Sequence, residues 1–94
     1  MNEHAAPTVQ IDNVLTRVTQ WRWAPGATSG YQRHEYHYAV VPLTSGTLQV
    51  TGPNGQTTQA TLSAGEPYLR NAGVEHGVKN TTAFELVLVE IEFR

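Results

Sequence analysis

Two histidines stand where their rings could act together. His34 and His76 lie 42 positions apart, each at the end of a predicted strand beside a turn. Gln32 precedes His34 by two residues, so both side chains point to one face of a strand. Imidazole nitrogens suit Zn, Ni, Fe and Cu. Residues of these types could together bind a metal ion, whereas composition alone favours the alternative of two histidines on separate strands with no joint role.

Arg70 is the candidate anchor for an anionic ligand. It follows Tyr68-Leu69, just before a turn at Asn71-Ala72-Gly73. A guanidinium can hold a carboxylate or phosphate through two parallel hydrogen bonds. The alternative is an outward-facing arginine paired with one of three acids, Glu66, Glu85 or Glu90.

Aromatic residues cluster around the same segments. Tyr36 and Tyr68 are candidate substrate contacts, and Tyr38 is a candidate catalytic acid or hydrogen-bond donor. Buried tyrosines more often pack with a satisfied hydroxyl, which is the alternative for all three. Trp21 and Trp23 share one strand face, and we expect them to serve core or dimer packing rather than a substrate platform.

The composition of the chain predicts an all-β scaffold that positions these residues. Thr and Val are abundant, Lys occurs once, and eight Gly and five Pro divide the chain into short segments. Short strands at this spacing are typical of a sandwich or barrel. Val87, Val89 and Ile91 alternate with more polar residues and are predicted to face the core. We expect strands within residues 8–24, 36–43, 47–51, 57–62, 68–70 and 78–94, and a loop at 25–30.

The chain resembles the cupin superfamily. In the second cupin motif, Gly, five residues, Pro-x-Gly, two residues, His, three residues and Asn follow one another. Gly65, Asn71-Ala72-Gly73, His76 and Asn80 keep this spacing, with Asn71 in the Pro place. The stretch from residue 21 to 80 is similar to small single-domain cupins associated with β-alanine degradation, through segments such as Val-Pro-Leu-Thr-x-Gly and Gly-Val-Glu-His.

The first cupin motif is degraded. It reads Gly, five residues, His-x-His, three or four residues, Glu, six residues, Gly. Gly26 is followed after five residues by Gln32-Arg33-His34, so glutamine replaces the first histidine. Counting back from Gly46 puts the missing acid at Ala39, or at Tyr38 if the turn is one residue longer.

The resemblance implies a single small cupin barrel, a double-stranded β-helix or jelly roll over residues 7–94, with a divalent metal in its mouth. His34 and His76 carry over as ligands, with Gln32 as a weak third. His37 could complete the shell if a bulge turns it inward, although on a regular strand it faces away from His34. Because no acidic ligand remains, we expect weak or partial occupancy by Zn, Ni or Fe.

Charge and composition restrict the partners. The net charge is −2, which argues against nucleic-acid and anionic-membrane partners. The longest apolar runs are far shorter than the ~20 residues of a membrane helix. Cysteine is absent, and residues 1–6 lack signal-peptide features, so we expect a cytoplasmic protein with a flexible tail at 1–6. A 94-residue chain has a thin core, which favours a homodimer.

Three functions fit this sequence. The first is a metal-assisted enzyme acting on a small polar carboxylate, such as a β-alanine-type catabolite. The second is a metal-free or weakly metallated module that binds a small molecule, which the missing acid favours. The third is a metal-free acid–base enzyme using His34, His76 and Tyr38. The sequence leaves enzymatic activity undecided between them.

Overall fold

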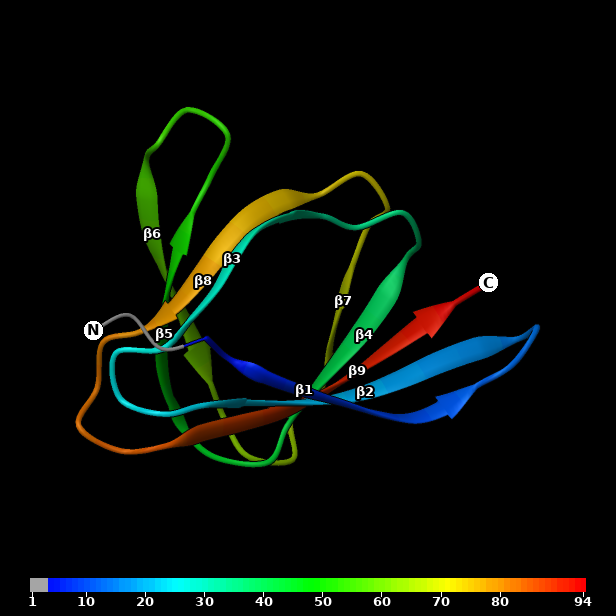
Figure 1. Cartoon of the computed structure of the whole chain (residues 1–94), viewed down its shortest axis with the longest axis horizontal. Helices are drawn as coiled ribbons and strands as arrows, with labels where there is room; N and C mark the ends of the chain where they lie inside the picture. Colours follow the sequence, from blue (N-terminus) through cyan, green and yellow to red (C-terminus); the bar gives the residue numbers. More distant parts are fainter. Residues whose placement is uncertain (1–3) are drawn as a thin grey trace.

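A computed structural model describes residues 4–94, which form nine strands and no helix (Figure 1). All pairings between these strands are antiparallel. The strands are β1 (Ala6–Asp12), β2 (Thr16–Trp23), β3 (Thr28–Arg33), β4 (Tyr38–Pro42), β5 (Gly46–Thr51), β6 (Thr57–Leu62), β7 (Tyr68–Arg70), β8 (Glu75–Asn80) and β9 (Leu86–Phe93).

The strands form two sheets that enclose the interior. One has the order β1-β2-β9-β4-β7 and the other β3-β8-β5-β6. Figure 1 shows the four-stranded sheet lying over one side of the five-stranded sheet, with the β1–β2 turn reaching beyond it. The architecture confirms the predicted all-β class. Within residues 4–94, no helix is long and apolar enough to cross a membrane.

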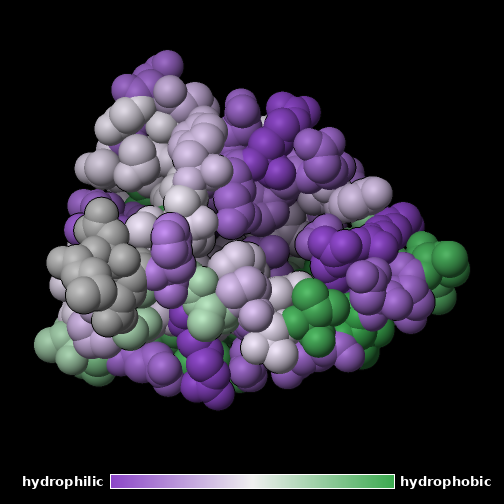
Figure 2. Space-filling model, in the orientation of Figure 1, coloured by the Kyte–Doolittle hydropathy of each residue, from purple (hydrophilic) through white to green (hydrophobic). Residues whose placement is uncertain are grey.

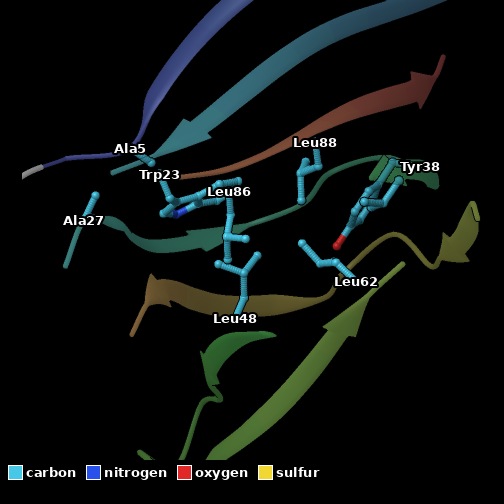
Figure 3. Close-up of a cluster of buried hydrophobic side chains, with 9 residues drawn as sticks. Ala5, Trp23, Ala27, Tyr38, Leu48, Leu62, Leu86 and Leu88 are labelled. Atoms are coloured by element: carbon cyan, nitrogen blue, oxygen red, sulfur yellow. The ribbon is translucent and has the colours of Figure 1, made fainter. Parts of the chain in front are cut away.

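The core lies between the sheets and borders the cavity that holds the histidines, with Tyr38 belonging to both. Side chains from both layers meet there, as Figure 3 shows for the labelled members. Trp23 and Leu86 come from one sheet and Leu48 and Leu62 from the other, and each is at most 4% exposed. Burial of large apolar side chains is the main stabilisation of such a sandwich.

Strand β9 corrects one prediction. Leu86 and Leu88 face the interior, whereas Val87, Val89 and Ile91 lie on the opposite face, where Val87 is buried as predicted and the other two are only half-buried. The first three residues of β9 are buried on both faces, so the apolar pattern there does not reveal which face is inner. Because side chains alternate along a strand, Glu90 and Glu92 continue the inner face toward the opening.

Strand β3 corrects the predicted loop at 25–30. Gly30 lies inside β3 at φ 74°, where the register against β8 shifts between Thr28 and Tyr31. This φ favours glycine, and the shift is a β-bulge. Across the pair, a Cβ on Gly77 would lie 3.2 Å from the carbonyl oxygen of Gly30. The two glycines let β3 and β8 approach closely beside the histidines.

The described structure begins before the predicted domain boundary at residue 7. His4 forms an isolated bridge with Thr28, and Ala5 is buried in the core cluster. The predicted tail at 1–6 therefore falls partly on residues 1–3, which lie outside the described residues, and partly on residues that contact the barrel.

Candidate functional site

A cavity of about 180 Å³ opens between the two sheets, on the side where β3 and β8 face β4, β7 and β9. It continues into a wider groove lined by residues such as Val9, Tyr36 and Glu92. Figure 2 shows that much of the surface around the opening is hydrophilic (purple). The polar and aromatic residues that line the cavity are Trp21, Trp23, Ser29, Gln32, His34, Tyr38, Thr58, Gln59, Tyr68, Arg70, His76 and Glu90.

The two histidines meet in this cavity. Their Nε2 atoms are 3.1 Å apart, and their rings stand edge to face at 87°. His34 follows β3 directly, and its backbone still pairs with the chain entering β8: its N–H donates to the Val74 carbonyl, and its carbonyl accepts from the Gly73 N–H. His76 lies within β8 opposite Gln32. The second-motif turn therefore aligns the segments that bring the rings together.

Both rings are held neutral. Desolvation by burial lowers the pKa of His34, against a smaller raising effect of Glu92. Desolvation, with the nearby His34 and Arg70, lowers the pKa of His76 to about 4. Neutral imidazole is the form that ligates metals, and two neutral rings can also share one hydrogen bond. The pair suits either arrangement.

The donor set fits a metal ion only in part. The Nε2 separation is shorter than twice the ~2.0–2.1 Å Zn–N distance, so one ion can reach both nitrogens. Gln32 also lines the cavity, with its side-chain Nε2 donating to the Ser29 carbonyl, which leaves its amide oxygen as the acceptor. Across residues 4–94, no group of three His, Cys, Asp or Glu side chains is arranged to hold a metal.

His37 and Tyr36 lie away from the histidine pair. The His37 ring is exposed, and its Nδ1 accepts a hydrogen bond from the Ala72 N–H at 2.9 Å. It is not among the residues lining the cavity, so the inward bulge that a ligand role requires is not formed. Tyr36 is 41% exposed, lines the outer groove and lies under the guanidinium of Arg94. Neither residue reaches the cavity.

Tyr38 occupies the position of the missing acid. It is buried on the inner face, whereas Ala39 faces outward in the row of Ile91 and Leu69. This selects the longer of the two turns considered for the first motif. The Tyr38 ring stacks on His34 at 4.2 Å. Its hydroxyl points inward (Figure 3) and has no hydrogen-bond partner among the described residues.

Arg70 and Tyr68 line the cavity from β7, where Arg70 is the register partner of Tyr38 on β4. The Arg70 guanidinium lies 4.7 Å from the centroid of the Tyr68 ring, a cation–π contact. Within residues 4–94, no carboxylate lies within salt-bridge distance of Arg70, and Glu85 pairs instead with Arg22 at 2.9 Å. The predicted alternative of a structural ion pair for Arg70 is therefore not formed in this part of the chain.

Glu90 and Trp21 are cavity residues that sequence reasoning did not place in the site. Burial, with the neighbouring Glu92 carboxylate, raises the pKa of Glu90 to about 7. Trp21 stacks on Trp23 at 5.8 Å and faces the cavity, so the tryptophans belong to the interior. A reading of β9 with Leu86 and Leu88 inward would have placed Glu90 there by alternation.

Comparison with known proteins decides the family. The model of the cupin domain matches residues 19–92. The chain belongs to the cupin family. It is 53% identical over 90 residues to the β-alanine degradation protein BauB of Pseudomonas aeruginosa, covering 96% of this chain and 94% of that protein. This confirms the resemblance to small cupins associated with β-alanine degradation.

Solved cupin structures share the whole architecture. A cupin domain from Bordetella pertussis superposes with a TM-score of 0.96 at 45% identity, covering 100% of this chain and 97% of that one. A double-stranded β-helix protein from Klebsiella pneumoniae gives a TM-score of 0.77 at 20% identity, covering 96% and 76%, which shows the fold alone. The chain is thus a single small cupin barrel.

Proposed function

We propose that this cupin binds a small polar carboxylate in its barrel and acts on it with a divalent transition metal held by His34 and His76. The observation that carries the proposal is the Nε2–Nε2 separation of 3.1 Å inside a cavity that Arg70 also lines. A neutral histidine pair suits a metal cation, and the guanidinium suits a carboxylate. The similarity to BauB supports a β-alanine-type catabolite as the ligand.

Each residue has a distinct role in this proposal. His34 and His76 would hold the ion, with the Gln32 amide oxygen as a weak third donor. When bound, such a metal polarises a carbonyl or carboxylate oxygen or activates water or dioxygen. Arg70 holds the ligand carboxylate, and Tyr68 supports the guanidinium from below. With two imidazoles and no carboxylate, we expect partial occupancy by Zn, Ni or Fe.

A metal-free function is the second candidate. The direct contact between the two neutral rings favours it, because one ring can donate to the other without an ion. The barrel would then act as a small-molecule binding module or as an acid–base enzyme. In the latter, burial raises the pKa of Tyr38, so this tyrosine stays protonated and serves as a donor rather than as a base.

Elemental analysis separates these candidates. The protein is analysed as purified, after chelation and after reloading with Zn, Ni or Fe, and each form is titrated with β-alanine and propionate by calorimetry. We expect substoichiometric metal on purification, removal by a chelator, and carboxylate binding that strengthens after reloading. Carboxylate binding that is equal with and without metal would favour the binding module. Absence of any carboxylate binding would overturn the proposal.

A further inference from the structure

We propose that Tyr38, Trp21 and Glu90 form a second set of ligand contacts in the barrel, and that this set selects a carboxylate carrying an amino or hydroxyl substituent. The inference rests on the proposed function, since it takes the same cavity as the ligand site. It adds what the histidines and Arg70 leave open, namely which small carboxylate the cavity prefers.

Two buried donors in the cavity have no partner. Within the described residues, the Tyr38 hydroxyl and the Trp21 Nε1–H make no hydrogen bond, although both atoms are fully shielded by the chain. Buried polar groups are nearly always hydrogen-bonded in folded proteins, and an unpaired one costs about 1–3 kcal/mol. Both side chains line the cavity, so a turn of either ring toward it would let the shielded donor pair with an acceptor group on a ligand.

Glu90 supplies the acceptor between these donors. Its strand, β9, lies between β2, which carries Trp21, and β4, which carries Tyr38. Trp21 pairs with Leu88 and Tyr38 with Glu92, so each lies diagonal to Glu90 on the inner face. Diagonal neighbours in antiparallel sheets are about 7–8 Å apart. Glu90 therefore lies between the two donors on the face that lines the cavity.

The Glu90 carboxyl is itself free to bind. Across residues 4–94 it makes no salt bridge, and its register neighbours Thr19 and Val40 carry no charge. The charged and titratable groups around it are Glu92 on the same strand and Tyr38, Tyr68 and Arg70 on β4 and β7. An ammonium or hydroxyl group on the ligand would give this carboxyl a donor.

The combination defines a ligand class. Arg70 and the two unpaired donors suit the oxygens of a carboxylate or carbonyl, and Glu90 suits a cationic or hydroxyl substituent a few bonds away. A simple alkyl carboxylate satisfies the donors and leaves Glu90 without a partner. A site that leaves its own buried polar group unpaired discriminates strongly against the ligand that causes this.

Calorimetric titration with three matched ligands tests the inference. Propionate, 3-hydroxypropionate and β-alanine differ only in the substituent at carbon 3. For the wild-type protein, we expect the two substituted ligands to bind about tenfold or more tightly than propionate. Glu90→Gln removes the negative charge that an ammonium group would meet, and should abolish most of the preference for β-alanine over propionate.

Tyr38→Phe separates the donor role from a packing role. It keeps the ring that stacks on His34 and removes an unpaired hydroxyl, so the melting temperature without ligand should hold or rise. Affinity for all three ligands should fall by about 3- to 10-fold. Tyr36→Phe is the matched control, because Tyr36 lies outside the cavity, and it should change neither quantity.

The possible results distinguish selectivity among carboxylates from carboxylate binding itself. If propionate binds as tightly as β-alanine and Glu90→Gln has no effect, the selectivity inference is wrong while carboxylate binding stands. If Tyr38→Phe lowers the melting temperature without changing affinity, Tyr38 is a packing residue and the donor assignment fails. If none of the three ligands binds, the proposed function and this inference fall together.

Discussion

The ring of Tyr38 lies against the ring of His34, with centroids 4.2 Å apart and planes at 22°. Tyr38 stands at the acid position of the first cupin motif, so an aromatic surface replaces a carboxylate at this point. The stack limits rotation of the imidazole while its Nε2 meets that of His76. The first motif therefore still orients one histidine, although it no longer supplies a negative charge.

This relationship predicts a metal site that can be improved. Gln32→His restores the His-x-His of the family and should tighten Zn, Ni or Fe binding by about tenfold or more, given that even outer-shell partners are worth 10–100-fold. A further Tyr38→Glu change should tighten it again by adding an anionic ligand. His76→Ala should abolish binding, since the remaining ligands then come from one segment. Zn titration calorimetry measures all four proteins.

Two results would contradict the incomplete site. Nanomolar Zn affinity in the wild type, unchanged by Gln32→His, would mean that another side chain already completes the shell. Zn affinity that survives His76→Ala would remove the histidine pair from the site altogether. His37→Ala serves as the control, because the His37 ring is exposed and bonded to the Ala72 N–H.

Replacement of Arg70 should lower the affinity for small carboxylates without lowering the stability of the fold. Arg70→Leu removes the guanidinium and keeps most of the apolar stem on Tyr68. Loss of a charge-assisted contact should weaken binding of small carboxylates by roughly 1.5–3 kcal/mol. Arg33→Leu is the control, since Arg33 pairs with Glu35 at the surface and does not line the cavity. A melting temperature that falls with affinity unchanged would assign Arg70 to folding.

The wild type and the Glu90→Gln variant should differ in stability by an amount that depends on pH. The folded pKa of Glu90, about 7, exceeds the unfolded value of 4.5, so the folded state retains the proton more strongly. The carboxyl group's contribution is present below pH 4.5 and is lost as pH rises through 7. Glu90→Gln has no carboxyl group at this position. As pH rises from 4.5 to 8, its free energy of unfolding should therefore increase relative to that of the wild type, by up to about 3 kcal/mol.

Urea denaturation of both proteins across this range measures the difference. Glu66→Gln is the control, because Glu66 is exposed on a turn and should give parallel curves. If the free energy of unfolding of the wild type and that of Glu90→Gln depend on pH in the same way, the Glu90 carboxyl is not buried in the interior and its assignment to the ligand site is wrong.

We expect Asn80 to stabilise the turn between β8 and β9. This residue is fully buried, its amide donates to the Trp23 and Phe84 carbonyls, and its Oδ1 accepts from the backbone and hydroxyl of Thr82. Asn80→Ala breaks all four bonds and should cost about 2–4 kcal/mol. Thermal denaturation should show a fall of about 10 °C or more. Asn71→Ala, at an exposed turn, should change little, and equal effects would contradict the role.

Part of this site could be predicted from the spacing of residues in the sequence. The resemblance to the cupin motifs implied that His34 and His76 share one site, and the turn before β8 pairs with His34 through Gly73 and Val74 in a way that brings the two rings together. The turn signals at glycine and proline similarly predicted the all-β sandwich. These features depend on local chemistry that a single sequence displays.

The inner face of β9 could not be read in the same way. Leu86 to Leu88 are buried on both faces, so hydrophobicity does not distinguish inside from outside where the strand begins. Toward the opening, the interior face carries glutamates because it lines a cavity, while the outer face carries valine and isoleucine. The usual rule of apolar-in and polar-out is inverted at Glu90, which is why this residue was missed.

The outer face of the five-stranded sheet bears an apolar row. Ile11, Val18, Ile91, Ala39 and Leu69 are register partners in turn across β1, β2, β9, β4 and β7. The two ends of the row are exposed, Ile11 at 47% and Leu69 at 68%. No residue of this row carries a charge. An uncovered apolar row of this length on a small domain is typical of an interaction surface.

We propose that a second copy of the chain covers this face. The five strands hold 31 residues (7, 8, 8, 5 and 3), and at ~3.3 Å by ~4.8 Å for each residue they cover roughly 500 Å², more than half of the ~800 Å² per partner of a standard interface. An apolar row of this kind is complementary to itself when two copies meet about a two-fold axis. We therefore expect the predicted homodimer to use this face, and not the tryptophans, which face the interior.

Light scattering of the wild type at micromolar concentration should give twice 10.4 kDa. Leu69→Lys and Ile11→Lys place a charge on exposed positions of the row, where the fold of one protomer tolerates it, and each should shift the protein to monomer by leaving an unpaired charge in the interface. Val14→Lys is the matched control, because Val14 is 87% exposed at the β1–β2 turn and should leave the dimer intact. A wild-type monomer would show that one barrel suffices for stability. A dimer that persists in both row variants would place the interface on another face, where the open edge of β1 is the next surface to test.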